Sequence, residues 1–327
     1  MKQLGLNSTE VEPSASLGAE PKTPTESSAF DTHGSAVIVG LDGREHDADA
    51  LALARSLQAS LGGGLLLAHV MPPVPSGEGM IECERLERQQ GRELLTAVSA
   101  NLGRDDDVQL VESCPAPVGL SRLAARHGAS LLVLGSSHRG RVGRIVPGGV
   151  ASRLLSRAPC AIAVAPVGYA TRPHAPISRI GVAYDASEES DLALMAAARA
   201  ASRLGVPLRL YHAIHEVSTD PAWDKFREYI EDYARGILDA GQKQLPPGTE
   251  ATSIVLEGDV AQTIVEAASG DDVGLLFVGS RGYGPLREAV FGGVAGALLI
   301  AARCPLVIVP HSAQAAGRLP DPGKAGS

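Results

Sequence analysis

The sequence repeats itself, and this repeat constrains the fold more than any other feature of the chain. VIVGLDG at residues 37–43 is matched by IGVAYDA at 180–186, and LLVLGSSHRG at 131–140 is matched by LLFVGSRGYG at 275–284. Two further pairs, LLLAHV with LRLYHA and APCAIAVAP with ARCPLVIVP, keep the same separation of roughly 143 residues. Because self-similarity at one fixed offset is typical of a duplicated structural unit, we expect two copies of one domain.

The composition of the intervening segments suggests where the copies begin and end. The first residues are rich in Ser, Thr, Pro and Glu and poor in large apolar side chains, so a packed core is not expected there. A Pro-containing stretch, VGYATRPHAPIS at 167–178, is the expected linker. The predicted organisation is a disordered tail at 1–33, a first domain at 34–167, a second domain at 179–311 and a flexible tail at 312–327.

Each copy alternates short apolar runs with segments of helical spacing. The runs lack polar alternation, which favours strands buried on both faces of a sheet. Strict alternation of strand and helix predicts a parallel sheet covered by helices on both faces. We therefore predict two tandem doubly wound α/β domains, each with a five-stranded parallel sheet. In the first copy the expected strands are AVIVGL, LLLAHV, VQLVES, LLVLG and AIAVAP.

The polar and glycine residues that follow the first and fourth strands suggest a binding site. Ligands of open doubly wound sheets bind beyond the carboxyl ends of the strands, where the strand order reverses. If the order is 3-2-1-4-5, that point lies between strand one, which ends at Asp42 or Asp185, and strand four, which ends at Gly135 or Gly279. The carboxylate can accept hydrogen bonds from hydroxyl or amino groups. The glycine-containing loop that follows strand four lets backbone N–H groups approach an anion. A nucleotide fits both features, because its ribose or base can bind the carboxylate and its phosphates can bind the loop.

The glycine spacing of the second copy resembles a known family. Residues 279–293 read GSRGYGPLREAVFGG, which is Gly, two residues, Gly, nine residues and Gly-Gly. This is similar to the ATP-binding motif of universal stress proteins, Gly-x2-Gly-x9-Gly-Ser/Thr, and the similarity spans 36–166 and 179–310. It implies the strand order 3-2-1-4-5, ATP with Mg2+ as the ligand, and a stress-responsive cytoplasmic protein that is dimeric or tandem.

Carried over by position, the resemblance implies one set of ligand-lining residues in each copy. It assigns no catalytic residue and no protein metal ligand. The first set is Asp42, Val70, Gly135, Ser136, His138, Gly148, Gly149 and Val150, and the second is Asp185, Ala213, Gly279, Ser280, Gly282, Gly292, Gly293 and Val294.

Two departures from the family motif distinguish the copies. His138 stands where the motif has its second glycine, and Gly149 and Gly293 stand where it has Ser or Thr. Losing that hydroxyl removes a hydrogen bond to a charged group, which is worth roughly 1.5–3 kcal/mol, or about one to two decades of affinity. We therefore expect weakened sites, with the second copy the better of the two.

The leading functional hypothesis is a nucleotide-binding sensor or regulatory module that is not an enzyme. Two alternatives stay open: a weak ATPase or nucleotidyl-transfer enzyme on the same fold, and a partner-binding module that has lost nucleotide affinity. The sequence contains no Walker lysine and no S-G-G-x-D-S or H-x-G-H motif.

The remaining expectations concern partners and location. A net charge of −8 gives no indication of a nucleic-acid or membrane partner. The exposed edges of the two fifth strands favour an intramolecular pseudo-dimer of the domains, and a further homodimer stays open. Four cysteines without a C-x-x-C pair are typical of a reducing compartment, so a cytoplasmic location is expected.

Overall fold

The computed structural model describes most of the two repeats. The described residues are 36–61, 64–73, 81–102, 107–136, 149–154, 158–171, 176–215, 220–280 and 293–311. The chain divides into two units, Met1–Thr32 and His33–Ser327, and all described residues belong to the second unit. The predicted tails at 1–33 and 312–327 lie outside the described residues.

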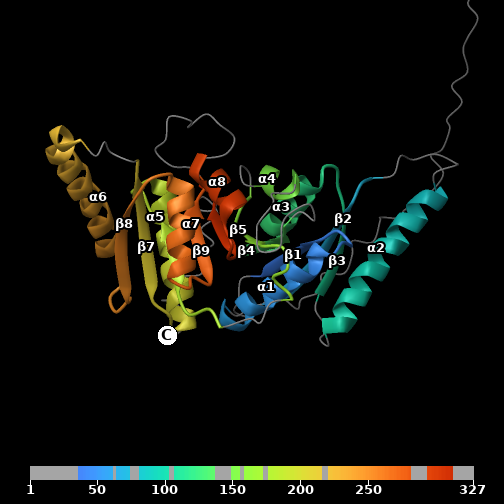
Figure 1. The fold of residues 1–327 in the computed structure, drawn as a ribbon. Coiled ribbons are helices and arrows are strands. Elements are labelled where there is room, and N and C mark those ends of the chain that lie inside the picture. The colour runs from blue at the N-terminus through green and yellow to red at the C-terminus, as the bar shows by residue number, and fades with distance from the viewer. Residues whose placement is uncertain are drawn as a thin grey trace, which may run out of the picture. The chain divides into compact units, whose positions relative to one another are not determined.

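Strands and helices alternate along both repeats in the order expected from the apolar runs (Figure 1). The first repeat contains β1 (Val37–Leu41), α1 (His46–Leu61), β2 (Leu65–Met71), α2 (Ile81–Leu102), β3 (Asp107–Glu112), α3 (Ala116–Arg126), β4 (Leu131–Gly135), α4 (Gly149–Leu154) and β5 (Ala161–Ala165). The second contains β6 (Ile180–Ala183), α5 (Glu188–Leu204), β7 (Leu208–Ile214), the 3-10 turn η2 (Pro221–Trp223), α6 (Asp224–Gln244), β8 (Ala251–Glu257), α7 (Val260–Gly270), β9 (Leu275–Gly279), α8 (Gly293–Ala301) and β10 (Leu306–Val309).

The strands of the described residues form one mixed sheet. Its order is β3-β2-β1-β4-β5-β10-β9-β6-β7-β8. Neighbours within each repeat run parallel, and β5 and β10 pair antiparallel, with Ala163 opposite Val307. The predicted doubly wound α/β class is therefore confirmed. The order reverses between β1 and β4 in the first repeat, and between β6 and β9 in the second.

The two faces of the sheet carry two separate apolar cores. Ile38 of β1 points into one core together with side chains of α3, α4, α7 and α8. Its neighbours Val37 and Val39 point into the other core, with side chains of α1, α2, α5 and α6. This alternation follows from the two-residue period of a strand, and it explains why strands buried on both faces read as continuous apolar runs. No helix among the described residues is long and apolar enough to cross a membrane.

Candidate functional site

A cavity of about 270 Å³ lies at the carboxyl ends of the first repeat's strands. Its lining includes Asp42 after β1, Val70 on β2, Gly135 at the end of β4 and Val150 on α4. These four predicted site residues therefore meet where the strand order reverses. The volume is close to the lower end of the usual range for ligand sites, about 300–1,000 Å³.

One side of this cavity is aliphatic. Ala68, Leu120 and Leu134 line it beside Val70, and no Phe, Tyr or Trp is among the lining residues that the structure describes. A planar base would therefore be held by aliphatic side chains and by backbone hydrogen bonds rather than by ring stacking.

The other predicted residues of the first site are only partly described. Ser136 follows β4 and is fully buried, and Gly149 is the first residue of α4. His138 and Gly148 lie outside the described residues, so the predicted difference at position 138 stays a prediction.

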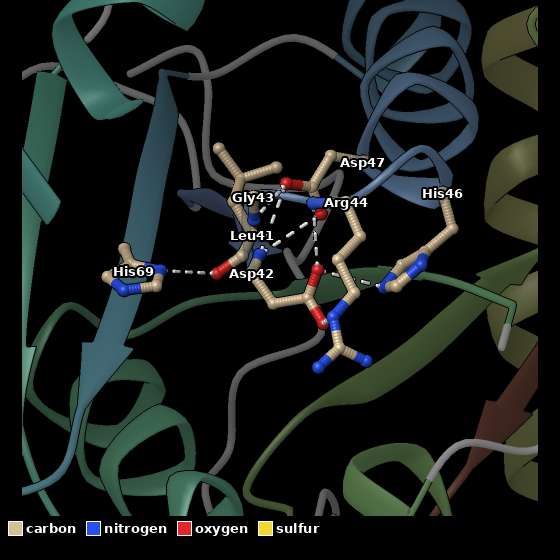
Figure 2. A network of polar contacts seen from close by, with 7 residues as sticks. All are labelled: Leu41, Asp42, Gly43, Arg44, His46, Asp47 and His69. Atoms are coloured by element: carbon tan, nitrogen blue, oxygen red, sulfur yellow. Dashed lines mark hydrogen bonds and ion pairs between the residues drawn. The ribbon is translucent and has the colours of Figure 1, made fainter. Parts of the chain in front are cut away.

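The turn between β1 and α1 is held by a buried carboxylate that the sequence analysis did not single out. Asp47 accepts the backbone N–H groups of Asp42, at 3.1 and 3.2 Å from its two oxygens, and of Gly43, at 2.7 Å (Figure 2). Burial raises the pKa of Asp47, and these two N–H bonds act in the opposite direction. Gly43 has a φ of +84°, a conformation that glycine adopts without strain.

The Asp42 side chain is engaged by two basic neighbours, as Figure 2 shows. His46 Nε2 lies 3.2 Å from Asp42 Oδ1, Arg44 Nε lies 3.7 Å from Oδ2, and the backbone N–H of Arg44 donates to Oδ1 at 3.1 Å. Burial alone would raise the pKa of Asp42, but the His46 hydrogen bond and the nearby positive charges lower it. The hydrogen bond to Asp42 in turn raises the pKa of His46, against the effect of burial.

Arg44 and His46 both line the cavity, although neither was predicted. The signal that could have found His46 is its position four residues after Asp42, at the start of a helix. A side chain in the first turn of a helix lies close to the turn that leads into that helix.

Ligand atoms of Asp42, His46 and Asp47 lie within 4.8 Å of one another, as they would in a metal centre. However, both oxygens of Asp47 already accept backbone N–H groups, and His46 is paired with Asp42. The hydrogen bonds and the ion pair account for this arrangement.

The glycines that end β4 and β9 have a packing role at this edge of the sheet. A Cβ at Gly135 would lie 2.2 Å from the backbone oxygen of His46, and one at Gly279 would lie 2.6 Å from the carbonyl carbon of Glu189. Each strand end therefore lies directly against the first turn of the first helix of its own repeat, α1 or α5. The sequence analysis linked these glycines only to the approach of an anion.

His69 and His212, which stand near the ends of β2 and β7, make the same structural contact. The Nδ1 of His69 donates to the backbone oxygen of Leu41 at 2.9 Å, and the Nδ1 of His212 donates to that of Tyr184 at 2.8 Å. Both rings thus connect the second strand of a repeat to the end of its first strand.

The second repeat surrounds its equivalent aspartate differently. Asp185 Oδ1 accepts the backbone N–H of Ser187 at 3.0 Å and its hydroxyl at 2.5 Å. Ser187 stands where the first repeat has Arg44, and Glu189 stands where it has His46. Glu189 Oε1 is 3.6 Å from His311 Nδ1. The second aspartate therefore has hydroxyl and amide partners where the first has two basic side chains.

The structure describes four of the remaining predicted residues of the second site, and they lie at the same edge of the sheet. Ala213 is on β7, Ser280 follows β9, and Gly293 and Val294 begin α8. Gly282 and Gly292 lie outside the described residues.

This geometry agrees with what comparisons with known proteins find. A model described as the universal stress protein family matches the chain twice, over residues 35–166 and 176–310. A universal stress protein of Mycobacterium tuberculosis (strain H37Rv) is 30% identical over 301 residues, covering 84% of this chain and 97% of the relative.

Two solved structures extend the comparison. A universal stress protein from Archaeoglobus fulgidus matches with a TM-score of 0.57 and 17% identity, covering 84% of this chain and 96% of its own, and this likeness shows the fold. A universal stress protein solved in complex with cAMP matches 40% of this chain and 95% of its own, with 21% identity and a TM-score of 0.32.

Proposed function

We propose that this chain, which belongs to the universal stress protein family and carries two family units in tandem, is an ATP-binding regulatory protein of the stress response. The observation that carries the proposal is the cavity at the strand-order reversal, where Asp42 faces an aliphatic wall. In this proposal the protein senses or signals nucleotide occupancy and is not an enzyme.

Different parts of the first site would bind different chemical groups of the nucleotide. The aliphatic wall around Val70 would hold the base, and the Asp42 carboxylate would accept a hydrogen bond from a ribose hydroxyl or an amino group. The phosphates, with Mg2+ as their counterion, would extend toward Gly135 and Val150, which line the cavity at the end of β4 and the start of α4. Because Asp42 is about half exposed, a ligand can reach its carboxylate beside Arg44 and His46.

The second site is proposed to bind ATP more tightly than the first. Ser187 and Glu189 stand where the first repeat has the basic Arg44 and His46, which lie beside the carboxylate of Asp42. The second copy also keeps both loop glycines of the family motif, Gly279 and Gly282, whereas the first has His138 at the second position.

Calorimetric titration of the full chain with Mg-ATP tests this function. We expect binding at two sites, with Asp42→Ala weakening one and Asp185→Ala the other. Loss of a charge-assisted hydrogen bond of roughly 1.5–3 kcal/mol corresponds to about 10- to 100-fold in affinity. Glu266→Ala, on the exposed surface of α7, is the matched control and should leave both affinities unchanged. No binding at millimolar Mg-ATP would refute the proposal.

A partner-binding module that has lost nucleotide affinity is the second candidate. It is favoured by the engagement of Asp42 with Arg44 and His46 and by glycine in place of the motif's Ser or Thr at 149 and 293. A crystal soaked with ATP in which side chains, and no nucleotide, fill both crevices would support it. A turnover assay well above background, lost in Asp185→Ala, would instead favour the weak ATPase or nucleotidyl-transfer alternative.

The proposal also includes an intramolecular pseudo-dimer and a cytoplasmic location. The antiparallel register of β5 with β10 supports the pseudo-dimer, because it uses both strand edges within one chain. The free cysteines of the described residues suit a reducing compartment. An association of two whole chains would then have to use a different surface.

A further inference from the structure

The N-terminal half of α6 has little contact with the rest of the described structure. The buried residues of this helix are Ala234, Leu238 and Gly241, all in its C-terminal half. None of the residues from 224 to 233 is buried. This half of the helix therefore gains little stability from packing, although packing provides most of the stability of helices in proteins.

Large aromatic side chains are concentrated on this half of the helix and on the residue before it. Trp223, Phe226, Tyr229 and Tyr233 are 49%, 47%, 65% and 63% exposed. The Trp223 and Phe226 rings form an edge-to-face pair with centroids 5.7 Å apart. The equivalent helix of the first repeat, α2, has exposed Ile81 and Leu86 but no aromatic residue.

The spacing of these residues forms a stripe that one helix can present to another. Phe226, Tyr229, Tyr233 and Gly236 follow each other at intervals of three, four and three residues, as the a and d positions of a heptad do. We call these four residues, with Trp223, the α6 aromatic face. A Cβ at Gly236 would have no atom within 4 Å, so this position leaves open space for a ring from a partner helix.

We infer that the α6 aromatic face is the surface through which two copies of this chain associate, with the two α6 helices antiparallel. In that arrangement Phe226 of one copy lies opposite Gly236 of the other, and Tyr229 lies opposite Tyr233. The stripe is thus complementary to itself, as a two-fold symmetric contact requires.

The charges beside the stripe favour the same arrangement. Lys225 and Asp239 are exposed and flank the two ends of the stripe on the same side. Neither has an ion-pair partner in the part of the chain that the structure describes. In an antiparallel pair, Lys225 of each copy comes close to Asp239 of the other, so two unlike charges meet at both ends.

The size of the face indicates a weak, concentration-dependent dimer. Aromatic residues bury about 150–250 Å² each, so four half-exposed rings supply roughly 400 Å² per copy and about 800 Å² per pair. Stable interfaces bury about 1,200–2,000 Å² in total, and the flanking side chains have to supply the difference. The β5 and β10 edges cannot contribute, because they pair within the chain.

Sedimentation of the nucleotide-free full chain across the micromolar range tests the inference. The chain has one tryptophan, Trp223, so its fluorescence reports directly on this face. We expect a monomer–dimer equilibrium, with Trp223 emission shifting to shorter wavelength as the dimer forms. Tyr229→Glu should give a monomer. Leu86→Glu, the same change at an exposed residue of α2, should leave the dimer intact.

A charge exchange provides an independent check that does not remove apolar surface. Lys225→Glu should weaken the dimer about tenfold, because like charges then meet at both ends. The double variant Lys225→Glu with Asp239→Lys should restore it.

Three outcomes would overturn the inference. The first is a monomer at every concentration with Trp223 open to quencher. The second is a monomer in which Trp223 is shielded, which would assign the face to another segment of the same chain. The third is a dimer that Tyr229→Glu does not weaken. Circular dichroism of each variant confirms that it is folded, and because no nucleotide is present, the result is independent of the proposed ATP binding.

Discussion

At the scale of single residues, the two repeats place the same aspartate in different electrostatic surroundings. Asp42 is paired with His46 and Arg44, whereas Asp185 accepts the hydroxyl and N–H of Ser187. Among Asp42, Arg44 and His46, the histidine is the residue type that titrates near neutral pH. The two repeats should therefore respond differently to pH.

The Asp42–His46 pair should stabilise the fold mainly at acidic to neutral pH. His46 has a raised pKa in the folded chain, so its contribution is complete below its unfolded value of 6.5 and is lost as pH rises through the folded value. Asp42 has a lowered pKa, so its contribution is present above 3.8 and is lost as pH falls through the folded value. The pair is therefore strongest between 3.8 and 6.5.

Chemical denaturation of the wild type and of His46→Gln measures this effect. The difference in free energy of unfolding should be largest between pH 3.8 and 6.5 and should shrink at higher pH. A difference that does not shrink as the pH rises above 6.5 would show that His46 acts through packing rather than through its charge.

Gly135 is the residue at which a methyl group should be least tolerated. Its Cβ would lie 2.2 Å from a backbone oxygen of α1, so β4 and α1 must separate. We expect Gly135→Ala to lower the free energy of unfolding by about 1–3 kcal/mol, as overpacked sites do. Gly270→Ala, where a Cβ meets nothing within 4 Å, is the control and should leave stability unchanged or slightly higher.

At the scale of elements, a buried carboxylate connects α1 to the chain that follows β5. Asp49 accepts the backbone N–H groups of Gly168 and Ala170 at 2.8 and 2.7 Å. These residues lie in the segment that leaves the first repeat toward the second. Helix α1 thus holds the start of the linker as well as the turn that carries Asp42.

Asp49→Ala should release this segment. Hydrogen bonds to a charged group are worth about 1.5–3 kcal/mol, so we expect a loss of about that size in the free energy of unfolding. Limited proteolysis should then cut within 167–171 faster than in the wild type. Glu87→Ala, on the exposed face of α2, is the control, and equal cleavage in both variants would contradict the role assigned to Asp49.

At the scale of the whole molecule, the two repeats share their cores. Each of the two apolar clusters contains side chains from both repeats. The strands β5 and β10 join the two halves through the pairs Leu306–Val164, Val307–Ala163 and Ile308–Ile162. If the proposed pseudo-dimer persists in solution, neither half can unfold without exposing part of the other's core.

Calorimetry should therefore show one cooperative unfolding transition for the full chain, with equal calorimetric and van't Hoff enthalpies. Gly135→Ala lies in the first repeat, yet it should move the whole transition to lower temperature. A transition that splits in two, with only one part moved by this substitution, would mean that the repeats unfold independently.

Much of the fold follows from local sequence pattern. Apolar runs without alternation identify the strands, because a strand between two helix layers is buried on both sides. The repeat then predicts that both halves have the same strand order. Parallel strands bring their carboxyl ends to one edge, so Asp42, Val70, Gly135 and Val150 could be predicted to meet although they are far apart in sequence.

Other features depend on contacts through space that no local period encodes. The ion pairs of His46 and Arg44 with Asp42, and the packing of Gly135 against α1, depend on how closely the strand ends approach that helix. The aromatic residues of α6 read in sequence like part of an amphipathic helix. Only the tertiary structure places them on the half of the helix that extends away from the core.

The sequence by itself determined the duplicated α/β fold and the edge of the sheet where Asp42, Val70, Gly135 and Val150 meet, because periodicity and strand direction are local properties. The tertiary structure decided which side chains surround each aspartate and which helix face is left uncovered. Those depend on the distances between elements that fold together from distant parts of the chain.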